Sequence, residues 1–450
     1  MIRIASASGY WGDWSQAPAL QVRSGPIDYL VLDYLAEVTL SIMSRQRAKD
    51  QHSGFASDFI RDVGPLIPEI LDKGITVIAN AGGVNPRACA QALLALAKEL
   101  KVSGLRVAVI EGDDVFELLQ SKKDDPNIGP LTSDEKTFGE VRNRLTAAHA
   151  YLSCGPVVEA LKAGANVVIT GRISDPGLFL APIVHEFGTA EDDWDSLAFG
   201  TVVGHILECG GQASGGNYLG DWKSVPNLER LGFPIAEVHD KSHASITKHE
   251  SLGGLINQAV IKEQLVYEIG DPTQYTTPDC TADFTTIQLS DEGKNRVGVT
   301  GVRGGTRPER LKVAGYYEDG WMVSGQISYP WPDAVAKARA AGELLRKRTL
   351  QLTGDRLEEW RIEAVGQSAC HGDLSLSSNP DEVTLRVAAR SQDRDACEVL
   401  AREFSPLVLT GPPGATGFAG GRPRPSRVHA YWAGLIPREW VKPRVEVLES

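Results

Sequence analysis

The N-terminal part of the chain alternates short apolar runs with stretches of helical periodicity, and this alternation limits the fold more than any other feature. Five runs are typical of strands buried on both faces, because they are short, continuous and bounded by glycine or polar residues. They cover residues 2–7, 29–33, 75–81, 105–111 and 166–171. Helix-like stretches lie between them. The alternation therefore predicts an α/β fold with a Rossmann-like, parallel, doubly wound sheet.

The second part of the chain has a different pattern. Several strand-like segments between residues 280 and 328 follow one another without intervening helices, and then come a helix at 332–352, a strand at 382–389 and a helix at 394–403. We therefore expect a Rossmann-like α/β domain at 1–270 and a smaller α+β domain at 271–450. The tail of the second domain holds a Gly/Pro-rich loop at 410–424. Such a loop is either functional or a surface crossover without chemistry.

Charge and composition exclude several classes of protein. The chain has 46 basic and 58 acidic residues, a net charge of −12, so we predict no nucleic-acid partner. No apolar run approaches the ~18–20 residues that cross a bilayer, and no secretory signal is recognisable, so we expect no membrane partner and a cytoplasmic location. The six cysteines form no CxxC pair, which argues against a zinc ribbon or a disulfide framework.

The segment at 80–86 is the first candidate for ligand binding. In a parallel sheet, ligands bind beyond the carboxyl ends of the strands. Here a strand end is joined to a helix start at Pro86, and a helix N-terminus favours negative charge. We predict that Asn80, Gly82, Gly83 and Asn85 bind the anionic part of a substrate. The alternative is a glycine turn needed only for packing.

Arg172 follows the fifth predicted strand in the same way. A guanidinium group can hold a carboxylate through two parallel hydrogen bonds, so Arg172 is a second predicted anion-binding residue. A structural ion pair is the alternative for this side chain.

Three residues are candidates for proton transfer. Glu37 lies just after the second predicted strand, although acidic residues also stabilise a helix start without any chemistry. His205 and Glu208 are three residues apart and therefore share one face of a helix. An acid and a base at this spacing suit general acid–base catalysis.

The same residues make a poor cofactor site. His205 and Glu208 supply only two metal ligands, so we assign no metal residues, and the need for a divalent metal stays open. The loop after the first strand lacks the GxGxxG spacing of a dinucleotide fingerprint. The sequence identifies no cofactor.

Nine segments resemble, in order, those of the acyclic terpene utilisation family AtuA, and they span nearly the whole chain. They are YWGD at 10–13, DYLAE at 33–37, NAGGVNP at 80–86, VVITGRISD at 167–175, GHILECGGQASGG at 204–216, ITKHESLGGL at 246–255, EQLVYEIGDP at 263–272, TPDCTADFT at 277–285 and TGPPGATGFAGGRP at 410–423. Members of this family are associated with degrading acyclic terpenes and other branched acids through acyl-CoA intermediates. Many relatives carry a small ferredoxin-like domain, fused or as a separate polypeptide. Because the tail ends soon after the glycine-rich segment, the resemblance leaves open a small ferredoxin-like partner chain that completes the site.

Together these features predict a catabolic enzyme of branched or terpenoid acid degradation. A hydratase or lyase acting on a carboxylate or acyl-CoA thioester needs an acid, a base and an anion clamp, and coenzyme A would arrive as part of the substrate. We expect a small-molecule acid or acyl-CoA as ligand and a homo-oligomer as assembly. The alternative is a non-catalytic ligand-binding or scaffold subunit that partners a catabolic enzyme.

Overall fold

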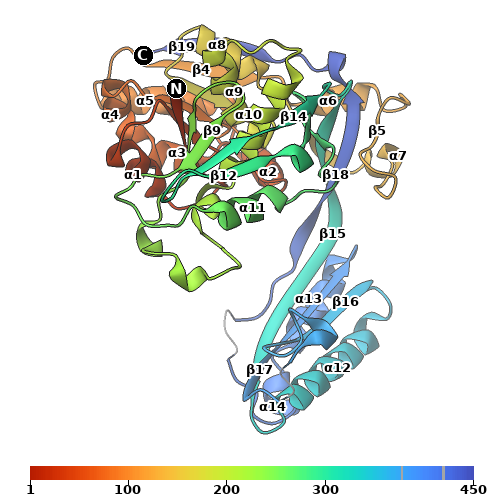
Figure 1. The fold of residues 1–450 in the computed structure, drawn as a ribbon. Coiled ribbons are helices and arrows are strands. Elements are labelled where there is room, and N and C mark those ends of the chain that lie inside the picture. Colours follow the sequence, from red (N-terminus) through yellow and green to blue (C-terminus); the bar gives the residue numbers. More distant parts are fainter. Residues whose placement is uncertain (377–378, 418–420) are drawn as a thin grey trace. The chain divides into compact units, whose positions relative to one another are not determined.

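The computed structural model describes residues 1–376, 379–417 and 421–450. Its internal contacts form two compact units, one of Met1–Gly315 with Tyr431–Ser450 and the other of Tyr316–Ala430 (Figure 1). The chain passes from one unit to the other within strands β15 (Arg310–Pro330) and β18 (Ser426–Pro437). The sequence placed the division at 270/271, whereas contacts group residues 271–315 with the first unit. The reason is that two strands from this stretch join the sheet of that unit.

The first unit is built on a ten-stranded sheet with the order β12-β13-β9-β8-β1-β2-β3-β7-β4-β19. Its centre consists of five neighbouring parallel strands. They are β1 (Ile2–Ser8), β2 (Tyr29–Leu32), β3 (Thr76–Ala79), β7 (Val167–Thr170) and β4 (Arg106–Glu111). These are the five strands predicted from the sequence. Their carboxyl ends lie at one edge of the sheet.

The sheet as a whole is mixed and not parallel as predicted, because antiparallel strands extend it on both sides. These strands are β8 (Ile235–Val238), β9 (Ala244–Thr247), β13 (Val297–Thr300), β12 (Gln288–Asp291) and β19 (Arg444–Glu449). Alternation of strands and helices along the sequence predicts parallel pairing only where a crossover helix links two neighbouring strands. β8 and β9 are instead joined by a short turn, and β19 comes from the far end of the chain.

The remaining elements of the first unit are helices and short strands outside this sheet. The helices are α1 (Ala17–Ser24), α2 (Thr39–Lys49), α3 (Ser57–Asp62), α4 (Ile67–Asp72), α5 (Pro86–Glu99), α6 (Phe116–Ser121), α7 (Phe138–Val141), α8 (Gly155–Lys162), α9 (Asp175–Phe187), α10 (Trp194–Glu208) and α11 (Gln258–Val266). The short strands are β5 (Gly129–Pro130), β6 (Leu145–Ala150), β10 (Tyr275–Thr276), β11 (Thr281–Asp283) and β14 (Arg303–Gly305). β10, β11 and β14 form a three-stranded sheet, β5 pairs with β18 and β6 pairs with β15.

Two of these helices position candidate site residues. Helix α5 begins at the predicted residue, because Asn85 accepts a hydrogen bond from the amide of Ala88 and Pro86 occupies the first turn. Helix α10 begins after Asp193, whose side chain accepts from the amide of Ser196. Every residue of α10 from 197 to 208 is buried, so its polar side chains lie inside the unit.

The second unit has the element order β-α-β-β-α-β, which is typical of ferredoxin-like folds. In chain order the elements are β15, α12 (Ala334–Thr353), β16 (Glu359–Val365), β17 (Glu382–Ser391), α13 (Arg394–Glu403), the short α14 (Leu407–Thr410) and β18. β17 pairs antiparallel with both β15 and β16. Helices α12 and α13 contact each other and pack on β17 (Figure 1).

The core of the second unit follows from the spacing of small and branched residues on α12. Ala338, Ala341 and Leu345 are buried on one helix face, in the same apolar cluster as Leu385 and Val387 of β17. The Gly/Pro-rich loop predicted at 410–424 follows α14, and its residues 418–420 lie outside the described residues.

Candidate functional site

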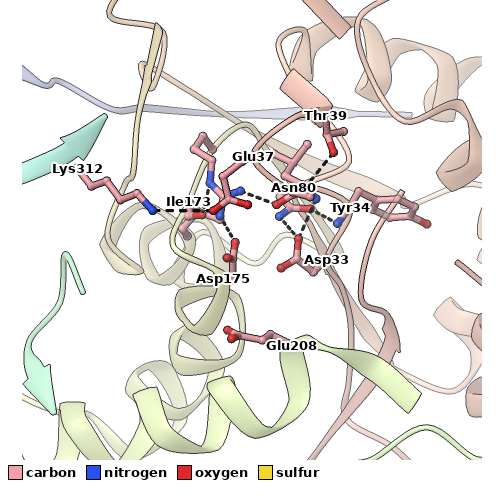
Figure 2. A network of polar contacts seen from close by, with 12 residues as sticks. Asp33, Tyr34, Glu37, Thr39, Asn80, Ile173, Asp175, Glu208 and Lys312 are labelled. Carbon is pink, nitrogen blue, oxygen red and sulfur yellow. Dashed lines mark hydrogen bonds and ion pairs between the residues drawn. The ribbon is translucent and has the colours of Figure 1, made fainter. Parts of the chain in front are cut away.

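Polar side chains from two neighbouring strand ends meet at the carboxyl edge of the sheet. Asp33 follows β2 and Asn80 follows β3. The Asn80 amide donates a 2.6 Å hydrogen bond to Asp33 Oδ1, and the backbone N–H of Tyr34 donates to Asn80 Oδ1, also at 2.6 Å (Figure 2). Asn80 is fully buried. Two strand-end residues, Asp33 and Asn80, therefore lie in direct contact at this edge of the sheet.

The carboxyl group of Asp33 is buried, with the residue 4% exposed. Its Oδ1 also accepts a 2.9 Å hydrogen bond from the backbone of Leu35. Burial raises the pKa of Asp33, although the positive charge of Arg172 and the hydrogen bond from Asn80 act in the opposite direction. Asp33 therefore holds a proton at higher pH than an exposed aspartate does.

Arg172 lies beside this pair and is 2% exposed. Its Nε donates to the carbonyl of Ile173 at 3.0 Å, one terminal nitrogen donates to the carbonyl of Leu35 at 2.6 Å, and the other forms an ion pair with Asp175. The guanidinium carbon lies 4.3 Å from the ring centroid of Tyr151. These contacts match the structural ion pair considered from the sequence. Substrate binding by Arg172 stays a prediction.

The backbone of the segment at 80–86 folds as a tight, buried turn. The N–H of Gly82 donates to Thr170 O at 3.1 Å, that of Gly83 to Asn80 O at 3.2 Å, and that of Asn85 to Gly82 O at 2.8 Å. Gly83 adopts a left-handed conformation with φ +54°. The predicted anion-binding amides therefore already donate to carbonyls of the chain. To bind an anion, these N–H groups must release the carbonyl oxygens to which they donate. Their role in binding stays a prediction.

His205 and Glu208 form the contact expected from their spacing. His205 Nδ1 lies 2.9 Å from Glu208 Oε1, and Nε2 lies 3.0 Å from the carbonyl oxygen of Gln264. A carbonyl oxygen only accepts, so Nε2 carries a hydrogen, and one further proton is shared between Nδ1 and Glu208. Glu208 Oε2 is buried without a hydrogen-bond partner among the described residues.

The environment of Glu208 favours its neutral form. Burial raises its pKa, the charge of His205 opposes this, and the nearby Asp33 adds to the rise. Glu208 lies at the end of α10 and faces Asp33 and Asp175 across the network (Figure 2). Two carboxyl groups with raised pKa, Asp33 and Glu208, therefore influence each other from different elements.

Glu37 occupies a different environment. The sequence placed it in a helix, but α2 begins at Thr39 and Glu37 lies in the preceding loop. Its side chain is 54% exposed and lies 3.9 Å from Lys312 Nζ. Its part in proton transfer stays a prediction.

A second acid–histidine pair was not predicted from the sequence. His149 Nδ1 lies 3.0 Å from Asp113 Oδ2, and the same oxygen accepts the backbone N–H of Arg172 at 2.8 Å. Burial opposes protonation of His149, but the hydrogen bond and charge of Asp113 outweigh it and raise the pKa. Asp113 follows β4 at the carboxyl edge, a position that marks it as a candidate. His149 lies on β6, a strand that the sequence did not reveal.

The Cys209 thiol is a weak candidate for a nucleophile. Burial raises the pKa of the Cys209 thiol to about 12, so the thiolate needed for nucleophilic attack is scarce near neutral pH. Within residues 1–376, 379–417 and 421–450, no three His, Cys, Asp or Glu side chains are arranged as a metal site. No helix in the same ranges is long and apolar enough to cross a membrane.

A comparison with protein-family models gives a match over nearly the whole chain. The sequence model of the acyclic terpene utilisation family protein AtuA matches residues 2–447, which span both units. No curated protein and no solved structure matches the chain.

Proposed function

This chain belongs to the acyclic terpene utilisation family AtuA, and on that premise we propose that it is a hydratase or lyase acting on a carboxylate or acyl-CoA thioester. Family membership gives it a role in acyclic terpene utilisation. The finer proposal concerns the reaction type and the residues that perform it.

The observation that carries the proposal is the pair of buried carboxyl groups, Asp33 and Glu208, with raised pKa values. Addition of water to a double bond needs one group that takes a proton from water and another that gives a proton to carbon. Carboxyl groups whose pKa values lie nearer to neutral pH exchange protons more readily than exposed ones. Two such groups, one just after β2 and one at the end of α10, lie close enough to influence each other and supply both roles.

The balanced step is simple. The oxygen of water bonds to the β-carbon of an unsaturated acyl group while its proton passes to a base, and an acid delivers a proton to the α-carbon. The lyase direction reverses each transfer. We assign one of these two proton-transfer roles to Glu208 together with His205. The two side chains share a proton, and Glu208 Oε2 has no hydrogen-bond partner among the described residues.

Asp33 is assigned the other proton-transfer role. Asn80 and Arg172 act on it as positioning residues, because Asn80 donates to its carboxylate and the charge of Arg172 opposes the rise in its pKa. Binding of the substrate anion by Arg172 and by Asn80, Gly82, Gly83 and Asn85 remains part of the proposal. Glu37, beside Lys312, is retained as a further proton-transfer candidate.

The proposal is tested by incubating the protein with branched unsaturated acyl-CoA thioesters and the corresponding free acids, and by following gain or loss of water by mass spectrometry. We expect turnover of one class of compound. Glu208→Gln should abolish it, whereas Glu250→Gln, at an exposed carboxylate, should leave it unchanged.

Turnover that survives Glu208→Gln would refute the assignment of Glu208. A protein that binds one of these compounds in a thermal-shift assay but never converts it would refute the enzymatic proposal. It would support instead a ligand-binding subunit that partners a catabolic enzyme.

A further inference from the structure

A cavity of about 490 Å³ lies in the first unit, apart from the network around Asp33. Its walls include Ser44 and Arg47 of α2, Gln51 just after α2, Val84 of the 80–86 turn, and Asp114 and His149. Small-molecule sites in proteins are typically ~300–1,000 Å³ and combine apolar walls with a few convergent polar groups. The size and the lining of this cavity therefore suit a small polar ligand.

His149 presents one ring nitrogen without a protein partner. Nδ1 contacts Asp113 Oδ2, an oxygen that also accepts the amide of Arg172, so a hydrogen on Nδ1 completes the contact. Nε2 makes no hydrogen bond to any of the described residues. The residue is 2% exposed and lines the cavity, so a group bound there is the available partner for Nε2.

Arg47 provides a cation in the same wall. One of its terminal nitrogens donates to the carbonyl of Val84 at 2.5 Å, which fixes the guanidinium beside the 80–86 turn. Asn85 of that turn donates from Nδ2 to the carbonyl of Gln51, another lining residue. The segment predicted to bind an anion thus adjoins this cavity, and Arg47 and His149 are the basic residues among those that line it.

From these contacts the geometry points to a second ligand site, in which Arg47 and the Asp113–His149 pair bind a small anion, a carboxylate or a phosphate. Neither Asp33 nor Glu208, the proposed catalytic carboxyl groups, lines this cavity. With His149 protonated, the wall carries two cationic groups against the carboxylate of Asp114. Asp113 lies behind the ring, where its charge stabilises the protonated imidazole.

The test uses the full chain with ¹³C-labelled histidine. The chain has nine histidines, and the His149 signal is identified by its loss in His149→Asn. Inorganic phosphate, acetate and coenzyme A are titrated separately at millimolar concentrations. We expect a saturable shift of the His149 signal. A shift with phosphate and coenzyme A but not with acetate would assign the site to phosphate groups. A shift with acetate but not with phosphate would assign it to carboxylates.

Variants of helix α2 supply the matched comparison. Arg47→Gln should weaken binding roughly tenfold to a hundredfold, the usual value of a hydrogen bond to a charged group. Arg45→Gln, two residues away and outside the cavity wall, should bind as the wild type does. Arg47→Lys keeps the charge if Arg47→Gln fails to fold, and it should retain weakened binding.

Three results would overturn the proposal. They are a His149 signal that responds to none of the three probes, a folded Arg47→Gln variant that binds with wild-type affinity, and an Arg45→Gln variant weakened as much as Arg47→Gln. Each of these readouts measures binding, so the outcome is independent of whether the protein hydrates a thioester.

Discussion

Replacing Arg172 by lysine separates the two interpretations of this buried side chain. The guanidinium donates through three different nitrogens, to the carbonyls of Ile173 and Leu35 and to the carboxylate of Asp175. A lysine keeps the positive charge, but its single nitrogen on a flexible stem does not reproduce the planar fork. At least two of the three hydrogen bonds should therefore be lost.

The magnitude follows from the type of bond. A hydrogen bond involving a charged group contributes about 1.5–3 kcal/mol, so two lost bonds correspond to about 3–6 kcal/mol of unfolding free energy. Loss of the guanidinium contact with the Tyr151 ring adds about 0.5–2 kcal/mol. A typical domain is stable by only about 5–15 kcal/mol, so Arg172→Lys should destabilise the first unit severely.

The assay is urea unfolding, with the shift in midpoint read at constant slope. Arg61→Lys is the matched control, because Arg61 contacts Asp58 and Asp62 through a side chain that is 61% exposed. Exchange of this surface arginine should leave the unfolding midpoint nearly unchanged, because exposed ion pairs contribute little to stability. If Arg172→Lys unfolds with the same midpoint as Arg61→Lys, the structural account of Arg172 is refuted, and a role in binding substrate becomes the better explanation.

Three further substitutions test the surrounding structure. Burial raises the pKa of Glu208 in the folded protein above the ordinary value of about 4.3 that it has in the unfolded chain. The folded protein therefore binds this proton more tightly, and the wild type loses stability as the pH rises from the ordinary pKa through the raised pKa. Glu208→Gln lacks this loss and should gain stability relative to the wild type with rising pH, and parallel urea curves at all pH values would contradict the burial argument. Gly83→Ala places a methyl group against Met43 at a position with φ +54°, whereas the methyl group of Gly74→Ala meets open space at φ +67°. Gly74→Ala should lower the unfolding free energy by ~1–2 kcal/mol through the backbone conformation alone, and Gly83→Ala should lower it by more. Equal unfolding midpoints of the two variants would refute this. Asn85→Ala removes the cap of α5 and should lower the unfolding free energy by about 0.5–2 kcal/mol, visible as a lower melting temperature.

Much of the first unit follows from local sequence patterns. The five central strands were predictable because each is a short apolar run, and helix α5 because Asn85 and Pro86 mark its start. The antiparallel edges were not predictable, since β19 pairs with β4 across most of the chain and nothing local encodes that partner. Residues 271–315 were predicted in the second domain, whereas their contacts group them with the first unit. Their strands pair with strands far away in the sequence, and nothing local encodes these partners.

The candidate site was predictable to a similar extent. Helical spacing alone brings His205 and Glu208 together, and strand ends bring Asp33 close to Asn80. The sequence does not tell which donors of Arg172 are occupied, because its carbonyl partners are set by the path of the backbone. His149 was missed because its partner Asp113 lies on a different element.

The most direct test of the proposed chemistry is solvent deuterium exchange. The protein is incubated in D₂O with an α,β-unsaturated or β-hydroxy branched acyl-CoA thioester and with the corresponding free acids, and deuterium at the α-carbon is measured by mass spectrometry. A hydratase or lyase that delivers a proton from a buried carboxyl group should incorporate deuterium, and Glu208→Gln should not. No incorporation by the wild type from a compound that it binds, or equal incorporation by Glu208→Gln, would contradict the account.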